Sequence, residues 1–277
     1  MFRRLGLCLV ILGALVVVPG ASAAFPGPYA VQGGQGVASN DGSLRFIAFG
    51  SGAATVVRAN KTDNSTVMFR TLKGTFGVPM LSPNGPGEGM FRDGSRFVLQ
   101  TTGFHPLTQF LLLRTKDLST AASIKLNGVF AFDALSPNGN MLYLIQHKTV
   151  QDVNHYIVRA YDLQAHKLLP GRVADKTQQT WIMQGWAVSR ATSASGRWVY
   201  TLYANQGGTP FIHALDTVHG VAHCIGIPWP ATDPDQNDLY QATLTLNPAG
   251  TKLAVRLQGG SVYRFIDTTD WSVSTTA

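Results

Sequence analysis

Apolar and polar residues alternate along the chain in short runs, and a turn signal ending in glycine precedes each run. Alternation of this kind is typical of half-buried β-strands. Glycine in such a turn supplies the positive φ that a tight hairpin requires. The turn recurs at intervals of 45 to 57 residues, which indicates an internal repeat. Its five glycines are Gly42, Gly94, Gly139, Gly196 and Gly250.

A second mark follows each turn at a similar distance. It is an apolar strand that ends in aspartate followed by leucine or threonine. We predict that each aspartate accepts backbone N–H hydrogen bonds in the turn after its strand. In the first unit Val56 to Thr62 occupies this place without the aspartate. The aspartates are Asp117, Asp162, Asp216 and Asp267.

Each unit of roughly 50 residues holds four short strands, which predicts the blades of a β-propeller. The predicted fold is all-β: a single β-propeller of five, possibly six, four-stranded blades over residues 24–277. The second unit is ambiguous, because Leu81 to Gly85 also has the form of the turn. We interpret Pro86 to Met90 as an insertion in that hairpin.

The third unit carries a family resemblance. Its turn Leu135 to Gly139, the strand Met141 to Leu144 and the sequence Tyr161-Asp162-Leu163 resemble the secreted bacterial propellers of YVTN, TolB-like and WD40-like type. The resemblance covers most of residues 30–277 and implies a propeller fold and export. Members of these families include binding proteins, surface proteins and a few enzymes such as lactonases. Because the shared motifs are turns and strands, no catalytic residue is carried over.

Composition favours the all-β prediction. The chain contains only 13% charged residues and a single glutamate, Glu88. Long amphipathic helices usually draw on glutamate and lysine for their exposed faces, so an α-rich fold is disfavoured.

The N-terminus predicts export. Residues 1–23 combine Arg3 and Arg4, an apolar run from Leu5 to Val18 and a small-residue exit, which is the pattern of a cleaved signal peptide. The alternative, a transmembrane anchor, would need an apolar run of about 20 residues. We therefore expect a secreted, periplasmic or extracellular protein with no transmembrane span in the mature chain.

The mature chain has a formal net charge of +5, because cleavage removes two of the arginines behind the +7 of the full chain. The basic residues are scattered, which disfavours nucleic acid and leaves an unknown protein or polymer as the expected partner. Cys224 is the only cysteine that remains, so no intramolecular disulfide is expected.

Two residues on predicted innermost strands are candidates for ligand binding at the propeller axis. Asp133 lies on the strand Phe130 to Ala134, and Arg190 lies on the strand that begins at Trp186. Together they could hold a polar ligand or form a structural ion pair. Trp186 and Trp229 are the aromatic candidates for ligand binding. Trp229 stands between two prolines, and it could instead fill a blade edge.

The densest acidic stretch is the candidate metal site. Asp233, Asp235 and Asn237 have the alternating spacing of the first half of a Ca²⁺ loop, but the later glycine and glutamate positions do not match. The alternative is a solvated connection between blades. No cofactor is expected, and Ca²⁺ is the one alternative. His219 and His223 are predicted to lie on a hairpin, which separates residues four apart along the strand and disfavours a shared metal.

These patterns predict an exported, non-catalytic propeller that acts as a binding or interaction scaffold, with no assembled catalytic set. The alternative is a lactonase-like or other hydrolase with its site at the axial channel. In that case Asp133→Ala should abolish an activity without lowering the melting temperature. A third possibility is a structural repeat domain within a larger envelope assembly.

Overall fold

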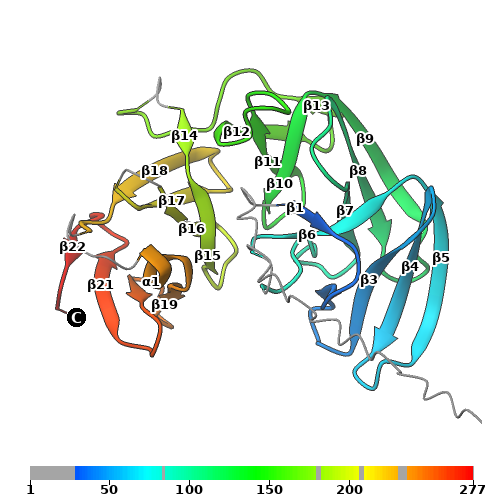
Figure 1. The fold of residues 1–277 in the computed structure, drawn as a ribbon, viewed down its shortest axis with the longest axis horizontal. Helices are drawn as coiled ribbons and strands as arrows, with labels where there is room; N and C mark the ends of the chain where they lie inside the picture. Colours follow the sequence, from blue (N-terminus) through cyan, green and yellow to red (C-terminus); the bar gives the residue numbers. More distant parts are fainter. Residues whose placement is uncertain (1–28, 83–84, 179–181, 206–208, 230–235, 277) are drawn as a thin grey trace, which may run out of the picture.

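The structure is a computed structural model that describes residues 29–276 except 83–84, 179–181, 206–208 and 230–235. The described residues form five antiparallel sheets and one short helix. We number the sheets I to V in chain order (Figure 1). None of the described helices has the length and apolar character needed to cross a membrane.

Each sheet is a meander of short strands. Sheet I contains β2 (Val37–Ala38), β3 (Leu44–Ser51), β4 (Ala54–Lys61) and β5 (Thr66–Lys73). Sheet II contains β1 (Tyr29–Val31), β6 (Phe76–Met80), β7 (Arg96–Thr101), β8 (Leu107–Arg114) and β9 (Thr120–Asn127). Sheet III contains β10 (Val129–Leu135), β11 (Met141–His147), β12 (His155–Asp162), β13 (Lys167–Leu168) and β14 (Met183–Gln184).

The last two sheets follow the same plan. Sheet IV contains β15 (Trp186–Thr192), β16 (Trp198–Ala204), β17 (Phe211–Asp216) and β18 (Val221–Gly226). Sheet V contains β19 (Thr243–Leu246), β20 (Lys252–Arg256), β21 (Val262–Asp267) and β22 (Val273–Ser274), and the helix α1 (Gln236–Tyr240) precedes it.

Both predicted sequence marks have the predicted conformation. The five turn glycines have φ between 68° and 77°, a region that side chains other than glycine rarely adopt. Each of the four aspartates accepts a backbone N–H from two residues further along, at 2.8 to 3.0 Å. The repeat is therefore a structural unit, and its polar residues close the turns between strands.

A third repeated device, which the sequence analysis missed, carries the chain from one sheet to the next. Gly74 and Gly128 follow the outermost strands of sheets I and II, with φ of 102° and 125°. The Thr55 hydroxyl donates to the Gly74 carbonyl at 2.8 Å and accepts the N–H of Phe76 at 2.8 Å. Thr108 makes the same two bonds to Gly128 and Phe130. A threonine on the third strand thus anchors the start of the next sheet.

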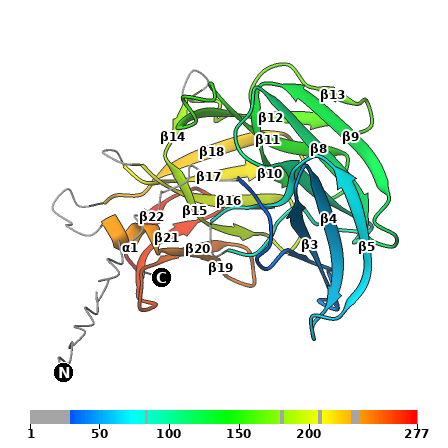
Figure 2. The ribbon, with the colours of Figure 1, turned by 45° about the vertical axis from the view of Figure 1, so that its right-hand side comes forward.

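Consecutive sheets are joined by apolar layers. Four buried clusters lie between sheets I and II, II and III, III and IV, and IV and V. Among the described residues no such cluster joins sheet V to sheet I, and the two end sheets stand apart in Figure 1. The sheets stack face to face in a curved series, which Figure 2 shows from a second direction.

Strand β1 was not predicted. It pairs antiparallel with β6, with Tyr29 opposite Met80 and Val31 opposite Val78. A side chain at Gly77 would meet the backbone of Val31 at 2.6 Å, so this close approach requires glycine. The N-terminal strand therefore lines the inner edge of sheet II, on the side of the axis.

Candidate functional site

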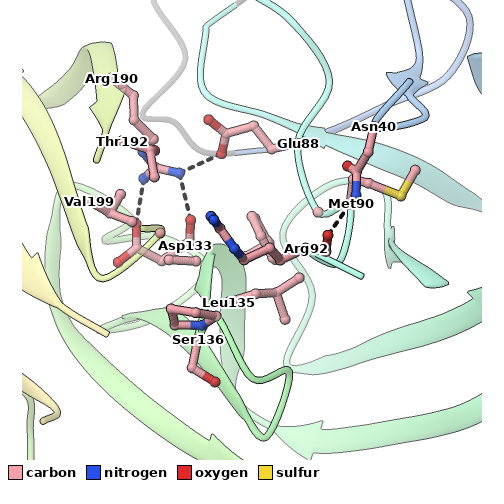
Figure 3. Close-up of a pocket in the computed structure, with 15 residues that line it drawn as sticks. Asn40, Glu88, Met90, Arg92, Asp133, Leu135, Ser136, Arg190, Thr192 and Val199 are labelled. Carbon is pink, nitrogen blue, oxygen red and sulfur yellow. Dashed lines mark hydrogen bonds and ion pairs between the residues drawn. The ribbon is translucent and has the colours of Figure 1, made fainter. Parts of the chain in front are cut away.

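An open pocket of about 560 Å³ lies where the inner strands and turns of sheets II, III and IV meet the turn of sheet I (Figure 3). This is the position at which the sequence placed Asp133 and Arg190. The pocket is lined by Asn40, Glu88, Gly89, Met90, Arg92, Phe132, Asp133, Ala134, Leu135, Ser136, Pro137, Arg190, Thr192, Gly196 and Val199.

Glu88 reaches the pocket through the predicted insertion in the hairpin of sheet II. Its backbone N–H donates to the Pro79 carbonyl at 2.7 Å, which folds the insertion back onto β6. Beside it, a side chain at Gly87 would lie 2.2 Å from the Gly36 carbonyl oxygen, so the loop passes directly against sheet I. The insertion therefore delivers the only glutamate of the chain to the axis.

Matching irregularities in two inner strands direct Asp133 and Arg190 toward each other. The register of β10 shifts between Phe132 and Ala134, and the register of β15 shifts between Ala187 and Ser189. A bulge adds one unpaired residue and re-aims the neighbouring side chains, and bulges are frequent next to functional sites.

Arg190 is the centre of a buried ionic cluster that we call the axial triad: Glu88, Asp133 and Arg190. One terminal nitrogen of Arg190 donates to Glu88 Oε2 and to the Asp133 carbonyl, and the other donates to Asp133 Oδ1, each at 2.5 Å. Its Nε donates to Thr201 Oγ1 at 3.0 Å. The side chains of Arg190 and Asp133 are 10% and 2% exposed. The guanidinium is therefore held in one orientation.

Burial shapes the electrostatics of the axial triad. It raises the pKa of Glu88 above its usual value; Arg190 opposes this effect and the nearby charge of Asp133 adds to it. Burial also works against the charged form of Arg190, but the carboxylates of Glu88 and Asp133 outweigh it and raise the pKa of the guanidinium. Arg190 therefore stays charged, and Glu88 is easier to protonate than an exposed glutamate.

Several polar atoms at the triad have no hydrogen-bond partner among the described residues. They include the buried Oδ2 of Asp133, together with the Tyr203 hydroxyl and His213 Nε2 in the layer behind it, between sheets III and IV. An unsatisfied buried polar atom is rare and calls for a ligand, a water or a functional reason.

The two aromatic candidates lie elsewhere. Trp186 donates from Nε1 to Asn154 at 3.3 Å and its ring lies 5.8 Å from that of Tyr240. Trp229 packs its ring 4.6 Å from Tyr263, against the apolar layer between sheets IV and V. Neither lines the axial pocket, so the structure unites Asp133 with Arg190 but not with the tryptophans.

The metal candidates are only partly visible. Asp233 and Asp235 lie outside the described residues, and Asn237 lies in the helix α1. Within the part of the chain that is described, no three histidine, cysteine, aspartate or glutamate residues are grouped for a metal ion.

The hairpin predicted around His219 and His223 is present as β17 and β18. His219 lies in its turn with Nδ1 2.9 Å from Asp216. Cys224 is free, and burial, to which the charge of Asp175 adds, raises the pKa of its thiol to about 12. At neutral pH this thiol is protonated, so it is not an activated nucleophile.

Two residues of the pocket escaped the sequence analysis as site residues. Glu88 was noted only for its rarity, although a single glutamate inside a hairpin insertion is a signal that could have marked it. Arg92 belongs to the turn of sheet II and looks like an ordinary turn residue in the sequence. Its position at the axis depends on how sheets II and IV face each other.

No family model and no curated protein matches the sequence. Solved structures do match. Sqt1 from Saccharomyces cerevisiae aligns over 86% of this chain and 61% of its own, with 12% identity and a TM-score of 0.53. The Dos1 propeller aligns over 87% of this chain and 57% of its own, with 9% identity and a TM-score of 0.47. TolB from Acinetobacter baumannii aligns over 79% of this chain and 48% of its own, with 17% identity and a TM-score of 0.41.

These matches concern the fold. The likeness to Sqt1 and the four-stranded antiparallel sheets identify a β-propeller type of architecture. The chain spans little more than half the length of the Dos1 and Sqt1 chains that it matches.

Proposed function

We propose that this protein is an exported, non-catalytic β-propeller of five blades that binds a small polar ligand at its axial pocket. In this proposal residues 1–23 are a cleaved signal peptide, and residues 24–277 act in the periplasm or outside the cell. Five sheets, each closed by the same turn, support the blade number. N-terminal sequencing of the exported protein tests the cleavage, which is expected after Ala23.

The observation that carries the proposal is the axial triad at the wall of the pocket. Arg190 is fixed by four hydrogen bonds before any ligand arrives, so ligand binding costs little reorganisation of the site. Polar atoms converging on a concave pocket are the usual mark of a small-molecule site. The lining, as far as the structure describes it, contains neither histidine nor cysteine, which disfavours imidazole and thiol chemistry.

Ligand-observed NMR with a mixture of amino acids, sugars and organic acids tests this function. Thr192 is exposed and lines the pocket, so Thr192→Trp should fill it and abolish the binding signal without changing the melting temperature. Thr120, exposed at the start of β9, is the matched control, and Thr120→Trp should bind as the wild type does. Binding that survives in Thr192→Trp would contradict an axial ligand site.

One observation favours the alternative, a hydrolase of lactonase type. Burial raises the pKa of Glu88, and a second carboxyl, Asp133, shares Arg190 with it. A carboxyl with a raised pKa beside a second carboxyl is an arrangement used for general acid–base catalysis. A panel of lactones incubated with wild type and Glu88→Gln tests this: hydrolysis that is lost in the variant would replace the binding proposal.

A further inference from the structure

One hydrogen-bond acceptor in the lining of the axial pocket has no partner among the described residues. Four of the five N–H groups of Arg190 already donate within the triad or to Thr201, so this guanidinium has little capacity left for a ligand anion. Asp133 Oδ2 is buried without a donor, on a side chain that is only 2% exposed. A ligand N–H placed there would satisfy an atom that is otherwise costly to bury.

The charge of the axial triad points to the same kind of ligand group. Two carboxylates share one guanidinium, so the triad carries one net negative charge when both are ionised. In a partly enclosed site this charge attracts an ammonium group more strongly than a neutral hydroxyl.

Arg92 supplies the opposite charge in the same pocket. Its side chain extends from the turn of sheet II toward sheet IV, where a side chain at Gly196 would meet its terminal nitrogen at 3.2 Å. Among the described residues no carboxylate lies within ion-pair distance of Arg92, and Figure 3 shows its guanidinium at the pocket with no contact drawn to it. A planar guanidinium of this kind is suited to holding a carboxylate by two hydrogen bonds.

We propose that the axial pocket takes a zwitterionic ligand of the amino-acid type. The ligand ammonium lies at Glu88 and Asp133, and the ligand carboxylate lies at Arg92. This inference rests on the proposed function and names the class of ligand. The pocket volume of about 560 Å³ leaves room for both charged groups and the carbon chain between them.

Matched probes test the proposal. The zwitterions are β-alanine, γ-aminobutyrate and ε-aminocaproate, and each is compared with the alkylamine and the alkylcarboxylate of the same length by NMR titration of the full exported chain. At least one zwitterion should bind about tenfold more tightly than either matched single-charge probe. Equal binding of all three probes at every length would overturn the proposal.

Two variants assign the charges. Arg92→Gln should reduce affinity for the zwitterion and leave the alkylamine unchanged, whereas Glu88→Gln should weaken both. Arg114, an exposed arginine on β8, is the matched control, and Arg114→Gln should bind every probe as the wild type does. Zwitterion binding that is unaffected by Arg92→Gln would also overturn the assignment.

A third set of probes distinguishes failure of the zwitterion proposal from failure of the proposed binding function on which it rests. Glycerol and sorbitol are uncharged, hydroxyl-rich probes. One outcome is that glycerol or sorbitol binds, the zwitterions do not, and Thr192→Trp abolishes the binding. The axial binding site is then supported, and the zwitterionic class of ligand is wrong. If no probe binds the wild type, both proposals fail.

Discussion

Arg190 and Asp133 lie 57 residues apart in the sequence, on the inner strands of neighbouring sheets, and their side chains join at 2.5 Å beside the axial pocket. Both side chains are almost fully buried, so the pair is held in a medium in which an unpaired charge is expensive. This pair links stability and binding, because the residues that shape the pocket also hold sheets III and IV together.

Asp133→Ala should therefore destabilise the protein. Removing one partner of a buried ion pair costs about 3–5 kcal/mol when the other charge is left without compensation. Because Glu88 still pairs with Arg190 in this variant, the loss should lie at or below the lower end of that range. Urea unfolding at neutral pH measures the loss. The sequence alone had led us to expect an unchanged melting temperature in an enzyme, an expectation that did not consider this burial. The triple variant Glu88→Met/Asp133→Leu/Arg190→Met removes all three charges of the axial triad and should be more stable than Asp133→Ala; equal stability would contradict a coupled cluster.

His213 should make stability fall between pH 6.5 and 4. Burial lowers the pKa of His213 to about 4, against about 6.5 in an unfolded chain. Below pH 6.5 the unfolded chain takes up a proton that the folded protein does not, so folding loses about 3 kcal/mol by pH 4. In His213→Gln the fall in urea-unfolding free energy over this range should be smaller by that amount. The exposed His105→Gln should keep the wild-type slope.

Asp216 should protect the protein against acid down to about pH 2. Burial opposes its ionisation, but hydrogen bonds from Arg197 and His219 outweigh this and lower the pKa of Asp216 to about 2. The stabilisation is complete above the unfolded pKa near 3.9 and is lost as the pH falls toward 2. Asp216→Asn should cost about 2 kcal/mol at pH 7 and little at pH 2.5. Asp267→Asn changes the less deeply buried equivalent in sheet V, and an equal cost there would argue against the role of burial.

The turn glycines should differ in how well they tolerate a side chain. Gly139 and Gly250 both have positive φ, so alanine at either costs about 1–2 kcal/mol in backbone strain. A side chain at Gly139 would also meet Phe91 at 3.0 Å, whereas the space around Gly250 is open. Gly139→Ala should therefore lower the melting temperature more than Gly250→Ala. Gly250→Asn should be milder than Gly250→Ala, because asparagine tolerates this conformation.

Much of the fold follows from local signals. The glycine turns, the strand-ending aspartates and the insertion at Pro86 to Met90 depend on neighbours a few residues away, and all of them have the predicted form. The pairing of Asp133 with Arg190 followed from their equivalent places on two inner strands. A repeated unit places equivalent residues at equivalent depths, so one copy predicts the next.

Only part of the candidate site could be predicted, because the rest depends on contacts between residues far apart in the sequence. For Trp229 the sequence left open an exposed ligand anchor or a residue that fills a blade edge, and the contact with Tyr263 of sheet V places it at the edge. Glu88 and Arg92 belong to the hairpin and the turn of one sheet. The rarity of glutamate could have marked Glu88 as unusual, but no local pattern places either residue at the axis. Their role depends on a loop folding back on β6 and on the distance between turns of sheets II and IV.

By itself the sequence determined the strands, the turns and the order of the sheets, because alternation and glycine conformation act within a few residues. Only the tertiary structure decided that β1 joins sheet II, that the described parts of sheets I and V share no buried cluster, and that three charges meet at the axis. Those features depend on how whole sheets face one another. Such contacts join residues far apart along the chain, where no local spacing records them.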